Sequence, residues 1–258
     1  MASAETEVLD THAKGRAAEM AAAGGPGKRA YVQRMFSEIA PRYDLLNRVL
    51  SLGIDRSWRR AAIAALGWER RPAGRYLDLC AGTLDVAAAL ASAAGFSGHV
   101  VAADFAEPML RSGLVKGLSG RIGPVVADAL SLPLEDGSCD GALVAFGIRN
   151  VSGLDAALAE VHRVLAPGAR FVILEFSTPR VAAFRAAYHF YFRRVLPVIG
   201  GLVSGNASAY RYLPESVMHF PEGGVLAARM VHAGFTRVSW RPLTQGIAAL
   251  HVGDRGDS

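Results

Sequence analysis

The chain has 258 residues, 51% of them hydrophobic, so it is long and apolar enough to bury one large α/β core. Its two cysteines, Cys80 and Cys139, are too few for a disulfide framework or a zinc site, and we interpret both as reduced thiols in core strands. The 28 Lys and Arg residues exceed the 23 Asp and Glu residues, but they are spread along the chain without interleaved aromatics, which argues against a nucleic-acid partner and leaves an anionic membrane surface as an alternative.

The N-terminal segment, residues 1–30, is predicted to be a flexible tail. It is rich in Ala and Gly, and it carries charges without the hydrophobic stretch of a signal peptide, so we expect a cytoplasmic protein. Residues 32–66 follow with the pattern of two or three helices. We assign them to an N-terminal helical cap, residues 31–70, of a single domain that covers residues 31–258.

Strand-like and helix-like segments alternate from residue 75 onward. This rhythm of βαβ units predicts the doubly wound α/β class, a mostly parallel seven-stranded sheet with helices on both faces. The predicted strands are residues 75–79, 99–103, 122–126, 141–146, 170–176, 236–241 and 246–252, with the last two as an antiparallel hairpin. The predicted helices are residues 86–93, 108–116, 154–165 and 222–233.

The turn after the first predicted strand is the most informative motif. Asp78 lies near the end of the strand, and Gly82 allows a tight turn beneath a ligand. A dinucleotide-binding turn would show three glycines in the pattern GxGxxG, which this segment lacks, and that argues against NAD. The turn resembles the loop by which class I methyltransferases hold S-adenosylmethionine, with Cys80 and Leu84 where glycines are usual. We expect Gly82 and Thr83 to contact the amino-acid part of that ligand, and Leu84 to narrow the room for it.

Three further strand ends carry groups that suit the same ligand. In doubly wound sheets ligands bind outside the carboxyl ends of the strands. Asp104 ends the second strand, where a carboxylate can accept both ribose hydroxyls, and Asp128 with Ala129 follows the third strand at a place suited to the adenine amino group. Residues 146–150 emerge beside the expected methyl group. Their order and spacing predict a Rossmann-like class I S-adenosylmethionine-dependent methyltransferase.

Residues 184–202, FRAAYHFYFRRVLPVIGGL, are aromatic and basic first and apolar afterwards. The segment is too short and too charged to span a bilayer. It could lie against a membrane surface, or it could form a lid of the substrate pocket packed on the sheet, and the two interpretations are compatible. We assign it to an insertion, residues 180–220, that faces the substrate pocket or the membrane.

Several segments outside this core are specific enough to suggest a family. They are Tyr43 to Gly53 (YDLLNRVLSLG) with Trp58, Arg163 to Gly168 continuing to Ser177, Phe146 to Asn150, Ser204 to Asn206, and Tyr210 to Val217 (YRYLPESV). Together they resemble the ubiquinone/menaquinone biosynthesis C-methyltransferases over the region from Val32 to the C-terminus. General methyltransferases share the core but lack the first and last of these segments.

The resemblance implies methyl transfer from S-adenosylmethionine, without a metal, to a ring carbon of a prenylated hydroquinone. Carried over by position, the cofactor contacts fall on Thr83, Asp104, Asp128 and Ala129, beside Asp78 and Gly82 of the turn. Arg149 and Asn150 are predicted as the catalytic pair that orients the quinol oxygen and stabilises its developing charge. Tyr43, Asp44, Asn47 and Tyr210 are predicted to bind the substrate.

The chain departs from the family at three positions. Leu84 replaces a usual Gly, which puts cofactor affinity in question, and Asp55 replaces a usual His, which removes one candidate proton acceptor. Ala145 stands where some members have a Ser contact.

The acceptor stays open between demethylmenaquinol, which the segment Leu213 to Val217 favours, and a benzoquinol of the ubiquinone pathway. A different small-molecule acceptor is a further enzyme alternative. A catalytically silent scaffold of a quinone-biosynthesis complex is the alternative from another class, and Leu84 is the feature that favours it. Because the substrate is prenylated, we expect peripheral contact with the inner face of a membrane.

Overall fold

A computed structural model describes residues 15–43, 51, 53–115, 120–179, 185, 190, 194 and 207–257, with side chains described at all of these positions except 42 and 207–211. The α-helices are α2 (Lys28–Ile39), α4 (Asp55–Leu66), α5 (Asp85–Ala91), α6 (Glu107–Leu114), α7 (Leu154–Val164), α10 (Ala207–Met218) and α11 (Gly223–His232). The strands are β1 (Arg75–Leu79), β2 (His99–Asp104), β3 (Ile122–Val126), β4 (Cys139–Ala145), β5 (Leu165–Phe176), β6 (Phe235–Leu243) and β7 (Ala248–Arg255). Short 3-10 turns include η1 (Ala40–Arg42) and η3 (Ile148–Asn150).

The strands form one seven-stranded sheet in the order β3-β2-β1-β4-β5-β7-β6. The five strands from β3 to β5 pair in parallel, and β7 pairs antiparallel with both β5 and β6. The chain reverses its direction of travel across the sheet between β3 and β4, because β1 lies between β2 and β4. This confirms the predicted doubly wound class, and it places the topological switch point, where ligands bind in such sheets, beside β1.

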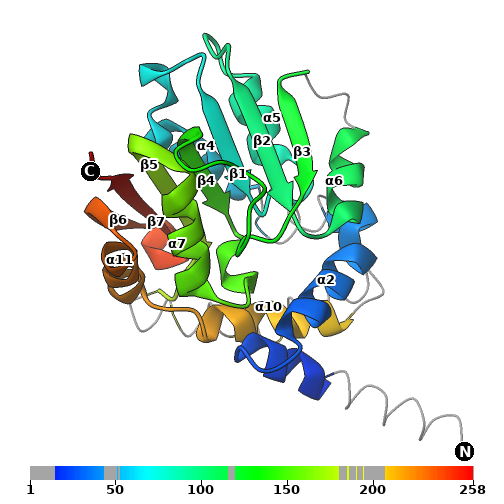
Figure 1. The fold of residues 1–258 in the computed structure, drawn as a ribbon. Helices are drawn as coiled ribbons and strands as arrows, with labels where there is room; N and C mark the ends of the chain where they lie inside the picture. Colours follow the sequence, from blue (N-terminus) through cyan, green and yellow to red (C-terminus); the bar gives the residue numbers. More distant parts are fainter. Residues whose placement is uncertain are drawn as a thin grey trace, which may run out of the picture.

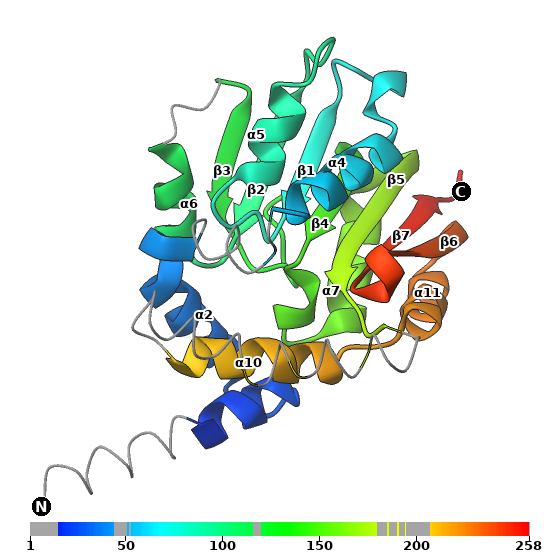
Figure 2. The ribbon, with the colours of Figure 1, turned by 180° about the vertical axis from the view of Figure 1, so that it is seen from behind.

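Helices cover both faces of the sheet. In Figure 1, α7 and α11 lie in front of the sheet, and Figure 2 shows α4 and α5 on the opposite face. Neighbouring strand residues point to opposite faces, so Tyr76 packs in the cluster with α4 and α5 while Leu77 packs in the cluster with α7 and α11. Full burial of each large apolar side chain stabilises the fold by about 1.5–3 kcal/mol.

The N-terminal region packs against the rest of the chain from residue 15 onward. Residues 15–22, predicted as part of the tail, are helical, and Ala18, Ala21 and Ala22 are buried in one cluster with Tyr212 of α10. Alanine favours helix, and its small side chain allows close packing, so a composition typical of a tail also suits a packed helix. In Figures 1 and 2, α2 and α10 lie beyond the carboxyl ends of the parallel strands.

One element boundary differs from the prediction in an instructive way. The helix predicted to end at residue 165 ends at Val164, and β5 begins at once, five residues earlier than predicted. Leu165 pairs with Cys139, and an irregularity in the ladder separates that pair from the regular pairing that resumes at Arg170. Gly168, with φ of +73°, lies in this stretch, so the turn residues Pro167 and Gly168 bend a strand rather than separate two elements.

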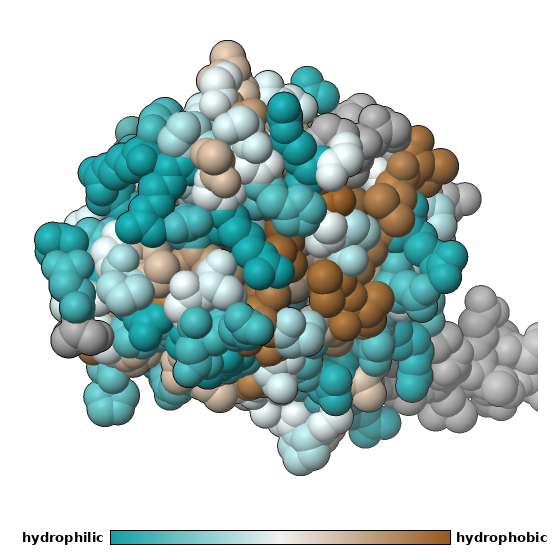
Figure 3. Space-filling view, turned by 45° about the horizontal axis from the view of Figure 1, so that its top comes forward, coloured by the Kyte–Doolittle hydropathy of each residue, from teal (hydrophilic) through white to brown (hydrophobic). Residues whose placement is uncertain are grey.

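The surface in Figure 3 is mostly hydrophilic, with hydrophobic residues gathered on the side where Figure 1 shows β3 and α6. The exposed hydrophobic residues of this side include Leu114, Val115 and Val126. β3 is an edge strand, and Pro124 within it lacks the amide that a further strand would need. Within the described residues, no helix has the length and apolar character needed to cross a membrane.

Candidate functional site

A cleft with about 670 Å³ of empty space, including the part open to solvent, lies at the carboxyl ends of β1 to β4. Loops after these four strands supply most of its walls, and α2, α6 and the turn after η1 supply the rest. The lining residues predicted from the sequence are Tyr43, Gly82, Asp104, Asp128, Ala129 and Asn150. The cleft therefore lies at the switch point where doubly wound sheets bind ligands.

The loop after β1 turns beneath the cleft. Gly82 lines the cleft with φ of +53°, a conformation that glycine adopts without steric cost. Asp78 lies within β1, before the loop, and its Oδ2 accepts a hydrogen bond of 2.9 Å from the amide of Ala87 in α5. Burial raises the pKa of Asp78 to about 7. Asp78 and Thr83 are buried and do not line the cleft, so they support the loop from within.

Leu84 does not narrow the cleft, which corrects the expectation from the sequence. Its side chain is fully buried in the core cluster and does not line the cleft. It packs against Gly113 of α6 so closely that a Cβ on Gly113 would lie 2.6 Å from Leu84 Cγ. The backbone of Leu84 has φ of +66°, which is costly for a leucine, and core packing offsets that cost.

Asp104 connects the end of β2 to the loop after β1. Its Oδ2 accepts a hydrogen bond of 2.9 Å from the amide of Gly82, and its Oδ1 accepts one of 2.8 Å from the amide of Ala106. Each carboxylate oxygen can accept a second hydrogen bond, so the group holds the loop and keeps acceptor capacity for a ligand. Burial raises the pKa of Asp104, against the effect of these amides.

Asp128 lines the cleft after β3 and contacts α2. Its Oδ1 accepts a hydrogen bond of 3.0 Å from the amide of Leu130, and its Oδ2 lies 2.9 Å from Nε of Arg29. Lys28, the neighbour of Arg29, donates a 2.8 Å hydrogen bond to the carbonyl oxygen of Arg149. The start of α2 therefore connects the loops after β3 and β4 across the cleft.

Arg149 is held away from the cleft by a buried ion pair. Its Nη1 lies 2.7 Å from Oε1 of Glu175, and the side chains of the pair are 6% and 1% exposed. It also donates hydrogen bonds to the carbonyl oxygen of Phe146 and to Ser216 Oγ. Arg149 is not among the residues that line the cleft, whereas its neighbour Asn150 is. The predicted pair thus occupies two different environments.

Asn150 and Phe146 form the wall after β4. The hydroxyl of Tyr212 in α10 donates a 3.1 Å hydrogen bond to Asn150 Oδ1. Phe146 adopts φ of +60°, and Gly147 approaches the loop after β1 so closely that a Cβ on Gly147 would lie 2.3 Å from the Cβ of Cys80. Only glycine fits at position 147, and its absent side chain brings the loops after β1 and β4 together at the cleft.

The predicted substrate residues are described only in part. Tyr43 lines the cleft, and its ring contacts Phe36 edge-on with centroids 5.9 Å apart. Asp44 and Asn47 lie outside the described residues, as does the side chain of Tyr210. Ala145 lines the cleft without a polar side chain.

Asp55, which stands where the family usually has His, is not among the residues that line the cleft. It is buried, it accepts a 2.7 Å hydrogen bond from Ser51 Oγ, and it lies 3.4 Å from Arg59 Nε. Arg59 in turn lies over the ring of Phe146, 5.5 Å from its centroid. Asp55 therefore contacts Arg59, which in turn contacts the cleft wall.

Sequence reasoning missed several residues that line or support the cleft. They are Arg29, Phe36, Phe105 and Met109 in its walls, and Glu175 and Tyr212 behind them. The helical spacing of the buried residues of α2, Val32, Met35 and Ile39, was the available signal for the first two. Among the described residues, no group of three or more His, Cys, Asp or Glu side chains could hold a metal ion.

Comparisons with known proteins find relatives that match most of the chain. The model of the ubiE/COQ5 methyltransferase family matches residues 26–255. A demethylmenaquinone methyltransferase from Thermus thermophilus is 53% identical over 225 residues, which cover 86% of this chain and 100% of that protein. A ubiquinone/menaquinone biosynthesis C-methyltransferase UbiE from Geobacter sp. is 49% identical over 228 residues, which cover 87% of this chain and 96% of that protein.

Solved structures with a similar fold are more distant in sequence. A SAM-dependent methyltransferase from Thermotoga maritima, described as a possible histamine N-methyltransferase, has a TM-score of 0.61 at 17% identity and covers 87% of this chain and 99% of its own. The [4+2]-cyclase SpnF has a TM-score of 0.62 at 15% identity, with coverages of 88% and 96%. At such identities the likeness concerns the fold alone, and SpnF shows that this fold also carries other chemistry.

Proposed function

The chain belongs to the ubiE/COQ5 methyltransferase family, and we propose that it transfers a methyl group from S-adenosylmethionine to a ring carbon of demethylmenaquinol, which yields menaquinol. The family model and the relatives thereby confirm the family resemblance read from the sequence. The observation that carries the proposal is the 53% identity to a demethylmenaquinone methyltransferase along the whole length of that protein. The cleft of this chain lies at the switch point of the sheet, where such a fold binds its ligand.

The residues present fit S-adenosylmethionine. Asp104 keeps acceptor capacity at the cleft, Gly82 lets the backbone approach a ligand, and Gly147 lets the loops after β1 and β4 come together at the cleft. In this proposal Asp104 accepts hydrogen bonds from the ribose hydroxyls, and Asp128 with the adjoining backbone contacts the adenine amino group. When bound, S-adenosylmethionine supplies an electrophilic methyl group on a sulfonium.

The acceptor side of the cleft suits a ring with an apolar tail. Phe36, Tyr43, Phe105 and Met109 give this part of the wall an aromatic and apolar character. The reduced quinol is the electron-rich form, and its ring carbon forms a bond to the methyl carbon as the methyl–sulfur bond breaks. The electron pair of the broken methyl–sulfur bond stays with the sulfur of the departing thioether. The proton on that ring carbon then passes to water, and the electron pair of its C–H bond restores the aromatic ring.

Asn150 is the residue that we propose to orient a quinol oxygen. Since Tyr212 donates to its Oδ1, the amide NH₂ of Asn150 is the end that can donate to the substrate. Arg149 supports this turn through its bond to the carbonyl oxygen of Phe146, and its positive charge lies one residue away from Asn150. We retain a role for Arg149 in stabilising negative charge on the quinol, exerted through the wall rather than by contact.

A benzoquinol acceptor is the second candidate, since several relatives near 49% identity are named for both ubiquinone and menaquinone biosynthesis. The hypothesis of a catalytically silent scaffold loses the feature that favoured it, because the Leu84 side chain packs in the core and does not line the cleft. We further propose that the prenylated substrate is drawn from a membrane surface that the protein contacts peripherally.

The test is methyl transfer by purified protein from labelled S-adenosylmethionine in detergent. The acceptors are chemically reduced demethylmenaquinol, the oxidised quinone and a reduced benzoquinol precursor. We expect label on the reduced naphthoquinol alone, or far more label on it than on the other two acceptors. Label on the benzoquinol alone would move the protein to the other pathway, and no label with no cofactor binding would refute the enzyme assignment.

A further inference from the structure

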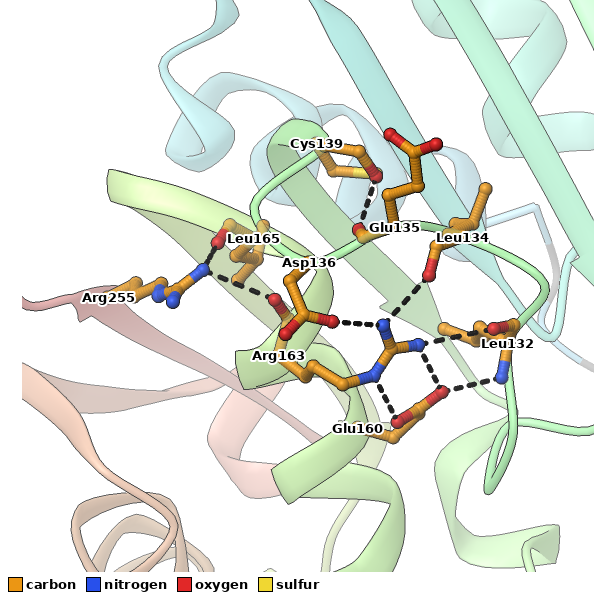
Figure 4. Close-up of polar contacts among 10 residues, drawn as sticks. Leu132, Leu134, Glu135, Asp136, Cys139, Glu160, Arg163, Leu165 and Arg255 are labelled. Carbon is orange, nitrogen blue, oxygen red and sulfur yellow. Dashed lines mark hydrogen bonds and ion pairs between the residues drawn. The ribbon is translucent and has the colours of Figure 1, made fainter.

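Arg163, at the end of α7, uses its guanidinium to bind both Glu160 of the same helix and the loop between β3 and β4 (Figure 4). Its Nε and Nη2 bind the two carboxylate oxygens of Glu160 at 2.9 and 2.7 Å. Its remaining donors reach Asp136 Oδ1 at 2.6 Å and the carbonyl oxygens of Leu134 and Leu132 at 2.8 and 3.2 Å. Three of these five bonds go to residues of the loop, so one side chain ties a helix to a connection that has no regular structure of its own.

Glu160 completes the attachment at Leu132. Its Oε1 accepts a 2.6 Å hydrogen bond from the amide of Leu132, whose carbonyl oxygen is bound by Arg163. Both backbone polar groups of Leu132 are therefore held from α7, and the Leu132 side chain is buried in the core. The bond to Arg163 also lowers the pKa of Glu160, which keeps the carboxylate charged.

Leu132 stands directly after the turn that reaches the cleft. The amide of Ser131 donates to the carbonyl oxygen of Asp128 at 3.0 Å, and the amide of Leu130 donates to the Asp128 carboxylate at the same distance. Before the turn, the amide of Ala127 donates to the carbonyl oxygen of Asp104. The turn at residues 128–131 is thus fixed on one side by β2 and on the other by Arg163 and Glu160.

We infer that Arg163 is a positioning residue for cofactor recognition, which through Glu160 and Leu132 holds the turn at residues 128–131 in register with the adenine of S-adenosylmethionine. This rests on the proposed function, which places adenine at Asp128 and Ala129. Arg163 belongs to a segment singled out in the sequence, and it does not line the cleft, so its effect passes through the backbone of the loop.

The guanidinium geometry is what lysine cannot reproduce. A planar fork with five donors binds a carboxylate with two parallel bonds and still reaches two carbonyls, whereas an ammonium is a single point charge with three donors. The Arg163 side chain is 33% exposed and that of Asp136 is 76% exposed, so this ion pair contributes little to global stability. Loss of the fork should therefore affect the loop more than the fold.

The test compares Arg163→Lys with the matched control Arg170→Lys. Arg170 is also partly exposed, and it binds Asp254 at 2.9 Å and the carbonyl oxygen of Ala65 at 3.0 Å, at the end of the sheet away from the cleft. We would measure the Kd of S-adenosylhomocysteine and of its inosine analogue, which lacks the adenine amino group, together with the KM for demethylmenaquinol and amide hydrogen exchange in residues 127–138.

In Arg163→Lys we expect the Kd of S-adenosylhomocysteine to rise about tenfold, the loss that small misplacement of a binding group causes. The preference over the inosine analogue should shrink, exchange at Leu132 should accelerate, and the KM for the quinol should stay unchanged. Arg170→Lys should change none of these. A wild-type Kd and preference in Arg163→Lys, or equal weakening in both variants, would overturn the inference.

Failure of the proposed function would look different. A wild-type protein that binds no S-adenosylhomocysteine refutes the cofactor assignment by itself. The structural part is then decided by hydrogen exchange, and unchanged exchange at Leu132 in Arg163→Lys refutes it.

Discussion

The carboxylates near the carboxyl ends of β1, β2 and β3 are held differently from those on β5 and β7. Asp78 and Asp104 accept hydrogen bonds from backbone amides. Asp128 also accepts one from a backbone amide, and it forms an ion pair with the largely exposed Arg29. Further along the sheet, Glu175 accepts hydrogen bonds from two backbone amides but also pairs with the buried Arg149, and Asp254 pairs with Arg170 and Arg237.

The difference indicates what each region can do. An amide neutralises little charge and leaves lone pairs free, so a carboxylate held in this way remains able to accept from a ligand. At Glu175 and Asp254 the arginine guanidiniums cancel the charge of the carboxylate, which suits a structural role. The cleft is lined by Asp104 and Asp128, which belong to the first group.

The largest effect should come from the ion pair between Arg149 and Glu175. Arg149→Met leaves a buried negative charge without its partner, and we expect unfolding free energy to fall by about 3–5 kcal/mol. The double variant Arg149→Met/Glu175→Gln should recover much of that loss in urea denaturation, since neither charge remains. Equal losses in the single and double variants would contradict the assignment of this pair to structure.

The same double variant tests the predicted catalytic role of Arg149. If its charge stabilises the quinol, turnover should stay low although stability and the Kd of S-adenosylhomocysteine are restored. Full recovery of turnover would leave Arg149 with a structural role alone.

The next effect concerns the pH dependence of stability at Asp78. Its pKa is raised from 3.8 to about 7 by burial, so between these values the folded state keeps a proton that the unfolded state has lost. Stability should therefore decrease as pH rises from about 4 to 7, by about 1.4 kcal/mol for each pKa unit. Asp78→Asn lacks this titration, so its unfolding free energy should improve relative to wild type across that range. A difference between the two proteins that is constant with pH would contradict the raised pKa.

Asp104→Ala should weaken cofactor binding more than it lowers the stability of the fold. It removes a charged acceptor from the amide of Gly82 and from the proposed ribose contact, each worth about 1.5–3 kcal/mol, so we expect the Kd of S-adenosylhomocysteine to rise about 10- to 100-fold in calorimetry. The matched control is Asp140→Ala. Asp140 also accepts a hydrogen bond from a backbone amide, that of Arg75 at 2.9 Å, but it lies near the start of β4, at the end of the strands away from the cleft. Similar weakening in both variants would show that the Asp104 effect is general.

The smallest effect should follow Arg29→Ala. Its ion pair with Asp128 joins side chains that are 62% and 24% exposed, and such pairs contribute about 0.2–1 kcal/mol. Unfolding in urea should shift slightly at low salt and less at high salt, since salt screens exposed charges. A loss as large as that of Arg149→Met would place Arg29 with the structural arginines.

Much of the fold could be predicted from the sequence because it depends on local patterns. β1 and β3 have the predicted bounds, Arg75–Leu79 and Ile122–Val126, since apolar runs ended by turn residues mark buried strands. The places of Asp104 and Asp128 at the cleft followed as well, because the carboxyl ends of parallel strands meet at one edge.

Other features of the site depend on segments that are far apart in the chain. The sequence determined the doubly wound class, the family and the acidic residues of the cleft, through periodicity and motif. Only the tertiary structure decided that the Leu84 side chain enters the core, that Arg149 binds Glu175, and that Arg29 crosses to Asp128. A side chain's direction is set by the packing around it, and a charge's role by its partner, and neither is encoded in the spacing of neighbouring residues.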